Sequence, residues 1–193
     1  MLRSFDGPTT MTQTIPSSRR WTYADYCRIP ADRKRHQIVD GRHFVSPAPS
    51  LRHQEVAGRL LVLLFDAIER KRRGRVFIAP VDVHLAPGTI VQPDLVVLGA
   101  RCTSRIGQKK ITGAPDLLVE ILSPSHRSFD TVLKRERYQR AGVRELWLVD
   151  PDADSLVQLV LRRGRYVEVA ADGPLVRLRA LRGPTVDLRA VFD

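Results

Sequence analysis

The chain has 193 residues, of which 43% are hydrophobic and 27% are charged. This length suits one domain around a single sheet, and this hydrophobic fraction excludes a wholly disordered chain. Lysine and arginine outnumber the acids by 32 to 21, which gives a formal net charge of +11. Such a charge favours a polyanionic partner, nucleic acid first of all, although a well-solvated arginine-rich surface would give the same number.

Cysteine usage and hydropathy indicate the compartment. Cys27 and Cys102 are the two cysteines, and they form no CxxC or other zinc-ligand spacing. No apolar run approaches the roughly 20 residues that span a bilayer. We therefore expect a cytoplasmic protein without disulfides, structural zinc or membrane contact. Residues 1–20 predict a flexible tail, and residues 21–193 a single domain.

The first half of the chain predicts a short helix, a β-hairpin and a long helix. Their ranges are 23–28, 36–45 and 53–72. Thr22 is a suitable cap for the first helix, and Asp40-Gly41 is a strong hairpin-turn signal. Within 53–72, Val56, Leu60 and Leu64 recur at helical spacing, so one face of this helix is expected to pack on a sheet.

From residue 75 onward the hydrophobic period is mostly that of strands. Strands are predicted over 75–78, 81–85, 91–98, 117–122, 145–149, 156–161 and 166–169. One more helix is predicted over 128–141, with Gly142 as its stop. The order of elements predicts an α/β fold in which helices flank a mixed central β-sheet.

Two acids stand inside predicted strands. Glu120 interrupts the apolar run 117–122, where a carboxylate is costly unless it is paired or bound to metal. Asp94 interrupts the run 91–98 in the same way. A salt bridge to one of the many arginines would explain Glu120 alone. Two carboxylates on adjacent strands, however, can share a hard cation such as Mg²⁺, which polarises a phosphoryl oxygen and activates water.

Asp116 offers another pairing with Glu120. Positions four apart on one extended strand share a face but lie roughly 13 Å apart, at about 3.3 Å per residue. That separation is too large for one cation. Asp94 is therefore the better partner, and Asp116 is expected to serve at the start of the strand.

The combination resembles the PD-(D/E)XK nuclease superfamily and, within it, a bacterial family of restriction-endonuclease-like proteins abundant in cyanobacteria and actinobacteria. The resemblance runs from about Trp21 to the C-terminus. Its segments are Gln37 to Gly41, Ser46 to Ser50 with His53, Val91 to Val97, Ala114 to Ser125, Lys134, Tyr138, and Ala141 to Pro151. It implies a restriction-endonuclease-like core and phosphodiester cleavage dependent on Mg²⁺ or Mn²⁺, with Asp94 and Glu120 as metal ligands.

The sequence departs from the superfamily signature at Leu122, where a lysine is usual. In the family that it resembles, the lysine comes from the following helix. Here Asp130, Lys134 and Tyr138 share one helical face, so Lys134 is the candidate, unless it is a solvated residue paired with Asp130. Tyr138 is expected to pack or to donate a hydrogen bond.

Three other positions bear on a site. Gln37 stands where the family usually has glutamate, which would weaken metal binding if this position contacts the metal. His53 and Glu55 begin the long helix, where we favour a helix-start or surface role for each. Basic groups at 70–75, 109–110 and 135–140 are candidates for phosphate contacts, which give affinity without sequence specificity.

The function predicted first is a metal-dependent endonuclease that acts on DNA, with Asp94, Glu120 and Lys134 as catalytic residues. A homodimer is the simplest way to place two sites on a duplex. The alternative is a non-catalytic nucleic-acid-binding protein that keeps the nuclease fold. A third possibility, cleavage of RNA by the same acids, is not separated from the first by the sequence.

Overall fold

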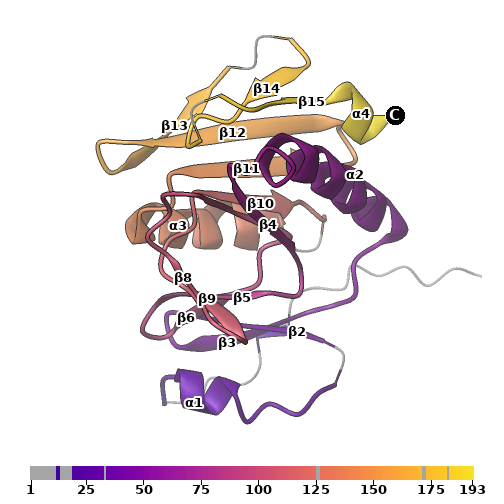
Figure 1. The fold of residues 1–193 in the computed structure, drawn as a ribbon. Helices are drawn as coiled ribbons and strands as arrows, with labels where there is room; N and C mark the ends of the chain where they lie inside the picture. Colours follow the sequence, from indigo (N-terminus) through magenta and orange to yellow (C-terminus); the bar gives the residue numbers. More distant parts are fainter. Residues whose placement is uncertain (1–11, 14–18, 33, 125–126, 171–172, 182) are drawn as a thin grey trace, which may run out of the picture.

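The computed structural model describes residues 12–13, 19–32, 34–124, 127–170, 173–181 and 183–193. Within these residues two large mixed sheets are present (Figure 1). In spatial order, sheet A contains β1 (Thr12–Gln13), β3 (Arg42–Ser46), β2 (Arg35–Val39), β6 (Thr89–Val91), β5 (Asp82–Ala86), β9 (Lys110–Thr112) and β8 (Arg105–Ile106). Sheet B contains β13 (Arg165–Val169), β12 (Ser155–Arg162), β11 (Glu145–Asp150), β10 (Leu117–Ile121), β7 (Leu95–Gly99) and β4 (Gly74–Ile78).

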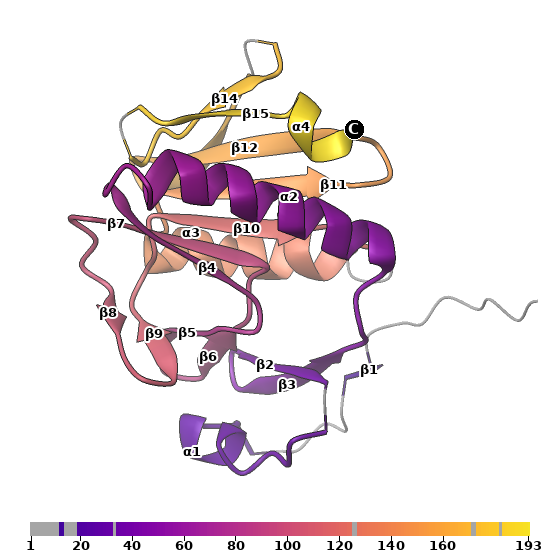
Figure 2. The ribbon, with the colours of Figure 1, turned by 45° about the vertical axis from the view of Figure 1, so that its right-hand side comes forward.

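Helices cover both faces of sheet B. The helical segments are α1 (Tyr23–Tyr26), α2 (Leu51–Ile68), the π-helical turn η1 (Phe129–Lys134), α3 (Arg135–Ala141) and α4 (Arg189–Phe192). Figure 2 shows α2 on one face of sheet B and α3 on the other. A small sheet of β14 (Leu175–Arg177) and β15 (Thr185–Asp187) lies beside α2 and α4.

Two hydrophobic cores follow from this layering. The α2 core joins Leu60 and Leu64 of α2 to one face of sheet B, including Val119 and Trp147. The inter-sheet core joins sheet A, η1 and α3 to the other face of sheet B, and Tyr138 is fully buried in it. Because neighbouring residues of a strand point to opposite faces, the strands β4, β7, β10, β11 and β12 each contribute to both cores.

The prediction of one central sheet was wrong, although the mixed α/β class is confirmed. The predicted strand 91–98 is divided, since β6 ends at Val91 in sheet A and β7 begins at Leu95 in sheet B. Pro93 lies in the gap. Proline has no N–H for a strand ladder, so a break at this position is the expected consequence.

Most other elements agree with the sequence patterns. Thr22 caps α1 through a capping box with Asp25, and Gly142 ends α3 in the left-handed conformation at φ 86°. The hairpin turn is formed by Asp40 and Gly41, both at positive φ. The long helix begins at Leu51, capped by Ser50, and ends at Ile68, before the predicted limit at residue 72.

The predicted tail of residues 1–20 lies mostly outside the described residues. Of that range the structure describes 19–20 and the short strand β1, which pairs antiparallel with β3. No helix in the described part of the chain is long and apolar enough to cross a membrane.

Glu145 is a buried acid that ties the C-terminal segment to sheet B. Its Oε1 accepts hydrogen bonds from Trp147 Nε1 at 2.7 Å and Gln158 Nε2 at 2.6 Å. Its Oε2 accepts one from the Ala180 backbone N–H at 2.7 Å. Burial raises the pKa of Glu145, and these hydrogen bonds oppose the rise.

We expect Glu145→Ala to lower the free energy of unfolding by about 2 kcal/mol, because it leaves three donors without their acceptor. Relief from burying an ionised carboxylate offsets part of this loss. Urea denaturation measures the change. The exposed Glu168→Ala on β13 is the control and should change stability by no more than about 0.5 kcal/mol. Equal unfolding free energies for wild type and Glu145→Ala would contradict the structural role given to Glu145.

Candidate active site

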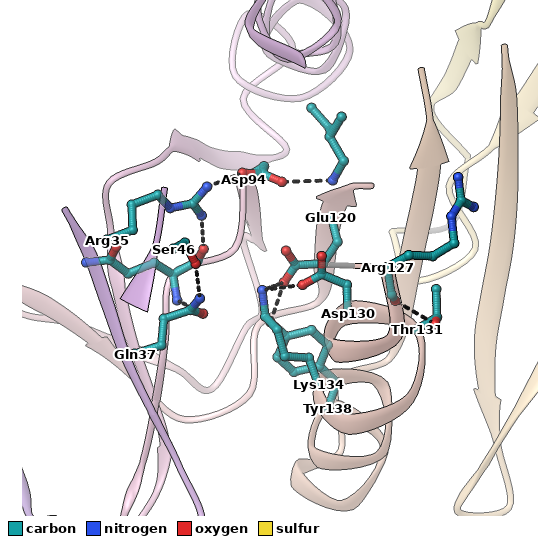
Figure 3. A network of polar contacts seen from close by, with 12 residues as sticks. Arg35, Gln37, Ser46, Asp94, Glu120, Arg127, Asp130, Thr131, Lys134 and Tyr138 are labelled. Carbon is teal, nitrogen blue, oxygen red and sulfur yellow. Dashed lines mark hydrogen bonds and ion pairs between the residues drawn. The ribbon is translucent and has the colours of Figure 1, made fainter. Parts of the chain in front are cut away.

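Asp94 and Glu120 lie side by side on the face of sheet B that borders the inter-sheet core (Figure 3). β7 and β10 are antiparallel, with Leu95 opposite Val119. Asp94 immediately precedes Leu95, and Glu120 immediately follows Val119, so the register brings the two acids together. The backbone N–H of Ile121 donates to Asp94 Oδ2 at 2.8 Å, which fixes the aspartate against β10.

Asp94 is surrounded by donors. Arg35 Nη1 lies 2.8 Å from its Oδ1, and His53 Nε2 lies 3.3 Å from its Oδ2. Burial alone would raise the pKa of Asp94, but the hydrogen bond from His53 and the charge of Arg35 hold that pKa well below its usual range. Asp94 is therefore a permanently ionised carboxylate.

Glu120 has a different environment. Lys134 Nζ lies 2.6 Å from Glu120 Oε1, and the Tyr138 hydroxyl donates to the same oxygen. Lys134 also pairs with Asp130 at 3.1 Å. Burial raises the pKa of Glu120 to about 7; the charges of Asp130 and Asp94 add to the rise, and Lys134 opposes it.

The helix that follows β10 delivers Lys134 to the site through a π-helical turn. Asp130 and Lys134 belong to η1, and Tyr138 lies one turn further in α3. Both Lys134 and Glu120 are only 2% exposed. Single π turns inside helices are frequent at functional sites, because they redirect side chains that a regular α-helix would space differently.

The donor set fits a hard divalent cation. The cluster joins three carboxyl groups, Asp94, Glu120 and Asp130, to two cations, Arg35 and Lys134, and carries surplus negative charge when Glu120 is ionised. Within the described residues, no group of three or more His, Cys, Asp or Glu side chains is placed to hold a metal ion. Two carboxylates completed by water are nonetheless a common way to bind Mg²⁺. Asp94 and Glu120 are the residues that would hold it.

Gln37 is buried beside this cluster, but its oxygen is already used. Gln37 Oε1 accepts the backbone N–H of Gln92 at 3.0 Å, and its Nε2 lies 3.5 Å from Ser46 Oγ. Gln37 therefore positions the segment that leads into Asp94. Its place in the structure gives it a supporting role in the site.

Asp116 lies apart from the site, at the start of β10. Its Oδ2 accepts the Gly99 N–H at 2.7 Å, and its Oδ1 pairs with Arg144. Leu122, which occupies the usual lysine position, packs in the inter-sheet core. Lys134 reaches Glu120 from the helix instead.

His53 lies in the first turn of α2, as expected, but its side chain is not on the surface. His53 is buried against Asp94, whereas Glu55 is exposed and pairs with Arg52 and Arg59. His53 shares the buried face of α2 with Val56 and Leu60, which is the signal that could have revealed its direction.

Arg35 is the site residue that sequence reasoning missed. It is the first residue of β2 and donates to the Gln92 carbonyl as well as to Asp94. Burial alone would lower the pKa of Arg35, but the charges of Asp94 and Glu120 raise it. The chain contains many arginines, and nothing in the sequence distinguishes Arg35 from the others.

A solved structure has the same overall fold as this chain. A crystal structure described as "a putative nuclease belonging to DUF820 from Anabaena variabilis ATCC 29413" is similar to the chain, with a TM-score of 0.73 and 18% identity. The similarity covers 89% of this chain and 97% of the other, so the chain has the same mixed α/β fold as that protein.

The family follows from the sequence match. Residues 23–189 match the Uma2 family, described as "Putative restriction endonuclease", and the chain belongs to this family. The search of curated proteins found no match.

Proposed function

We propose that this protein is an endonuclease that hydrolyses phosphodiester bonds, in DNA first of all, with Mg²⁺ or Mn²⁺. The observation that carries the proposal is the pairing of Asp94 and Glu120 on one face of sheet B, with Lys134 on Glu120 at 2.6 Å. Family membership supports nucleic acid as the substrate. Asp94, Glu120 and Lys134 are the proposed catalytic residues, and the two acids are the proposed metal ligands.

Each residue has a distinct proposed task. A bound divalent cation would polarise a phosphoryl oxygen and lower the pKa of its water. Asp94 supplies a fixed negative charge, because Arg35 and His53 keep it ionised. Glu120 supplies the second carboxylate. Lys134 orients Glu120 and brings a positive charge to the place where a phosphate would meet the two acids.

The test is the nicking of supercoiled plasmid by the purified full chain, with Mg²⁺, Mn²⁺ or EDTA. We expect nicking with either cation and none in EDTA. Absence of nicking in every condition, with salt-sensitive retention of DNA intact, would overturn the proposal for DNA. That outcome would favour the second candidate, a non-catalytic nucleic-acid-binding protein, and RNA would be the next substrate to test.

A specific observation supports the second candidate. Gln37 brings no charge, and Arg35 occupies an oxygen of Asp94 that a cation would need. A binding protein needs the basic surface but neither acid.

Lys134→Ala is expected to reduce the rate of nicking about 10- to 100-fold, because it removes a charge at the reacting phosphate. Calorimetric titration with Mn²⁺ should show little change in metal affinity, since both carboxylates remain. Loss of Mn²⁺ binding equal to that in Glu120→Ala would mean that Lys134 organises the ligands rather than the phosphate.

A further inference from the structure

A basic groove lies beside the candidate active site. It has a volume of about 1010 Å³ and lies between the start of α1, the β2–β3 turn, the β5–β6 turn and the η1–α3 helix. Its charged lining consists of five arginines and one acid: Arg19, Arg20, Arg42, Arg137, Arg140 and Asp40. The net charge of this lining is therefore strongly positive, which suits phosphates.

Three of these arginines are engaged in ion pairs. Arg19 pairs with Asp25, Arg137 with Asp40, and Arg140 with Glu136. Arg20 and Arg42, by contrast, form no ion pair within the part of the chain that the structure describes, and both are exposed. Arg42 acts on Asp40 through its charge, but an anion can approach Arg20 and Arg42 without breaking an ion pair of either.

The floor of the groove is held by backbone contacts. Trp21 N donates to the Gly41 carbonyl at 2.9 Å, and Gly41 N donates to the Gly88 carbonyl at 2.8 Å. Gly41 has φ +74°, and a Cβ added there would lie 2.9 Å from Arg20 Cβ. A side chain at position 41 would therefore push Arg20 away, and the glycine allows the strand turn and α1 to meet closely.

Aromatic rings line the same groove. Trp21 stacks on His43 with centroids 4.5 Å apart, and His43 stacks in turn on His36 at 5.1 Å. Tyr23 stacks on His84 at 5.5 Å. Trp21 is thus part of a column of three rings that holds its indole in place, next to Arg20 and Arg42. Aromatic platforms beside basic side chains are the usual way to bind single strands, whose bases are free to stack.

The groove and the candidate active site are joined by two elements. β2 begins at Arg35, which contacts Asp94, and ends at Val39, which lines the groove together with Asp40. Five residues of strand span about 17 Å. On the helix, Leu133 and Arg137 face the groove, while their neighbours Lys134 and Tyr138 contact Glu120.

We propose that this groove binds a single-stranded segment of nucleic acid, with phosphates on Arg20 and Arg42 and a base stacked on Trp21. The inference names the form of substrate for the proposed nuclease and rests on that function for its link to cleavage. Binding itself does not need the catalytic residues, so the two claims can be tested apart.

The probe is a fluorescein-labelled oligodeoxythymidylate of about 20 nucleotides, long enough for a typical single-strand site. The same strand paired with oligodeoxyadenylate is the duplex probe. Anisotropy is measured with the full chain in EDTA, so that no cleavage occurs. Tryptophan emission gives a second readout with unlabelled strands, because Trp147 is fully buried and Trp21 borders the groove.

Two variants probe the groove, and one is the control. Trp21→Ala should weaken single-strand binding about fivefold or more through the loss of stacking. Arg20→Gln/Arg42→Gln should lower the salt slope of single-strand binding by roughly 1.4, the value for two lost phosphate contacts. The control, Arg162→Gln/Arg165→Gln, removes the same charge from exposed residues at the β12–β13 turn.

We expect the wild type to bind the single strand more tightly than the duplex. Binding should quench tryptophan emission, and the control variant should bind like the wild type. Equal weakening by the groove and control double variants would overturn the proposal, because net charge alone would then explain binding. Equal affinity for duplex and single strand without quenching would overturn it as well. If the wild type nicks plasmid but the groove variants bind single strands normally, the groove proposal fails and the nuclease proposal stands. If single strands bind tightly through the groove but plasmid is not nicked, the nuclease proposal fails and the groove proposal stands.

Discussion

Asp94→Asn is expected to reduce metal-dependent nicking at least about 1000-fold, since it removes the negative charge of a proposed metal ligand. The substitution keeps the size of the side chain and an acceptor for the Ile121 N–H. It removes the negative charge that Arg35 and His53 now face. Glu120→Ala should reduce nicking to a similar level. The rate is measured on supercoiled plasmid with Mg²⁺, and DNA retention in EDTA should persist in both variants.

Asp116→Asn is the matched control. Asp116 is as buried as Asp94 and lies four residues before Glu120, but it contacts Gly99 and Arg144 away from the cluster. We expect its nicking rate to stay within a few-fold of wild type once the variant is shown to be folded. Full activity in Asp94→Asn, or an equal loss in folded Asp116→Asn, would contradict the pairing of Asp94 with Glu120.

The two acids of the candidate site could be predicted from the sequence because each interrupts an apolar run. Glu120 stands in an apolar strand, and Asp94 follows a proline in another apolar run, so each signals a cost that needs a compensating partner. For the lysine, the resemblance to the nuclease family supplied the expectation that it comes from the following helix, and the helical spacing of Asp130, Lys134 and Tyr138 then singled out Lys134. In the structure Lys134 contacts both Glu120 and Asp130.

The remaining features depend on contacts between distant segments. Arg35 meets Asp94 across 59 residues of sequence, and nothing in its neighbourhood distinguishes it from other arginines. The division of 91–98 between two sheets depends on what pairs with each half, although Pro93 marked the place. The groove is assembled from four segments, and its two free arginines can be recognised only when the partners of the others are known.

The stability of the metal-free protein is expected to fall between pH 5 and pH 8 because of Glu120. The pKa of this buried carboxyl is raised to about 7 in the folded chain, from an ordinary value of 4.5. The folded state therefore binds more protons than the unfolded state between these two values. The stabilisation of the folded state by the protonated Glu120 carboxyl is fully present below pH 4.5 and is lost as the pH rises through 7. The loss should reach about 3 kcal/mol, at 1.36 kcal/mol for each pKa unit.

Comparison with Glu120→Gln isolates this effect, because the histidines that titrate in the same range are common to both proteins. Burial lowers the pKa of His43 and His84, which makes stability rise with pH and opposes the Glu120 contribution in the wild type. Urea denaturation in EDTA should give a difference between variant and wild type that grows from pH 5 to pH 8. Mg²⁺ should then stabilise the wild type more at pH 8 than at pH 6, since the cation competes with the proton for Glu120. A difference independent of pH would show that Glu120 is ionised throughout, held so by Lys134, and the raised pKa of Glu120 would then be wrong.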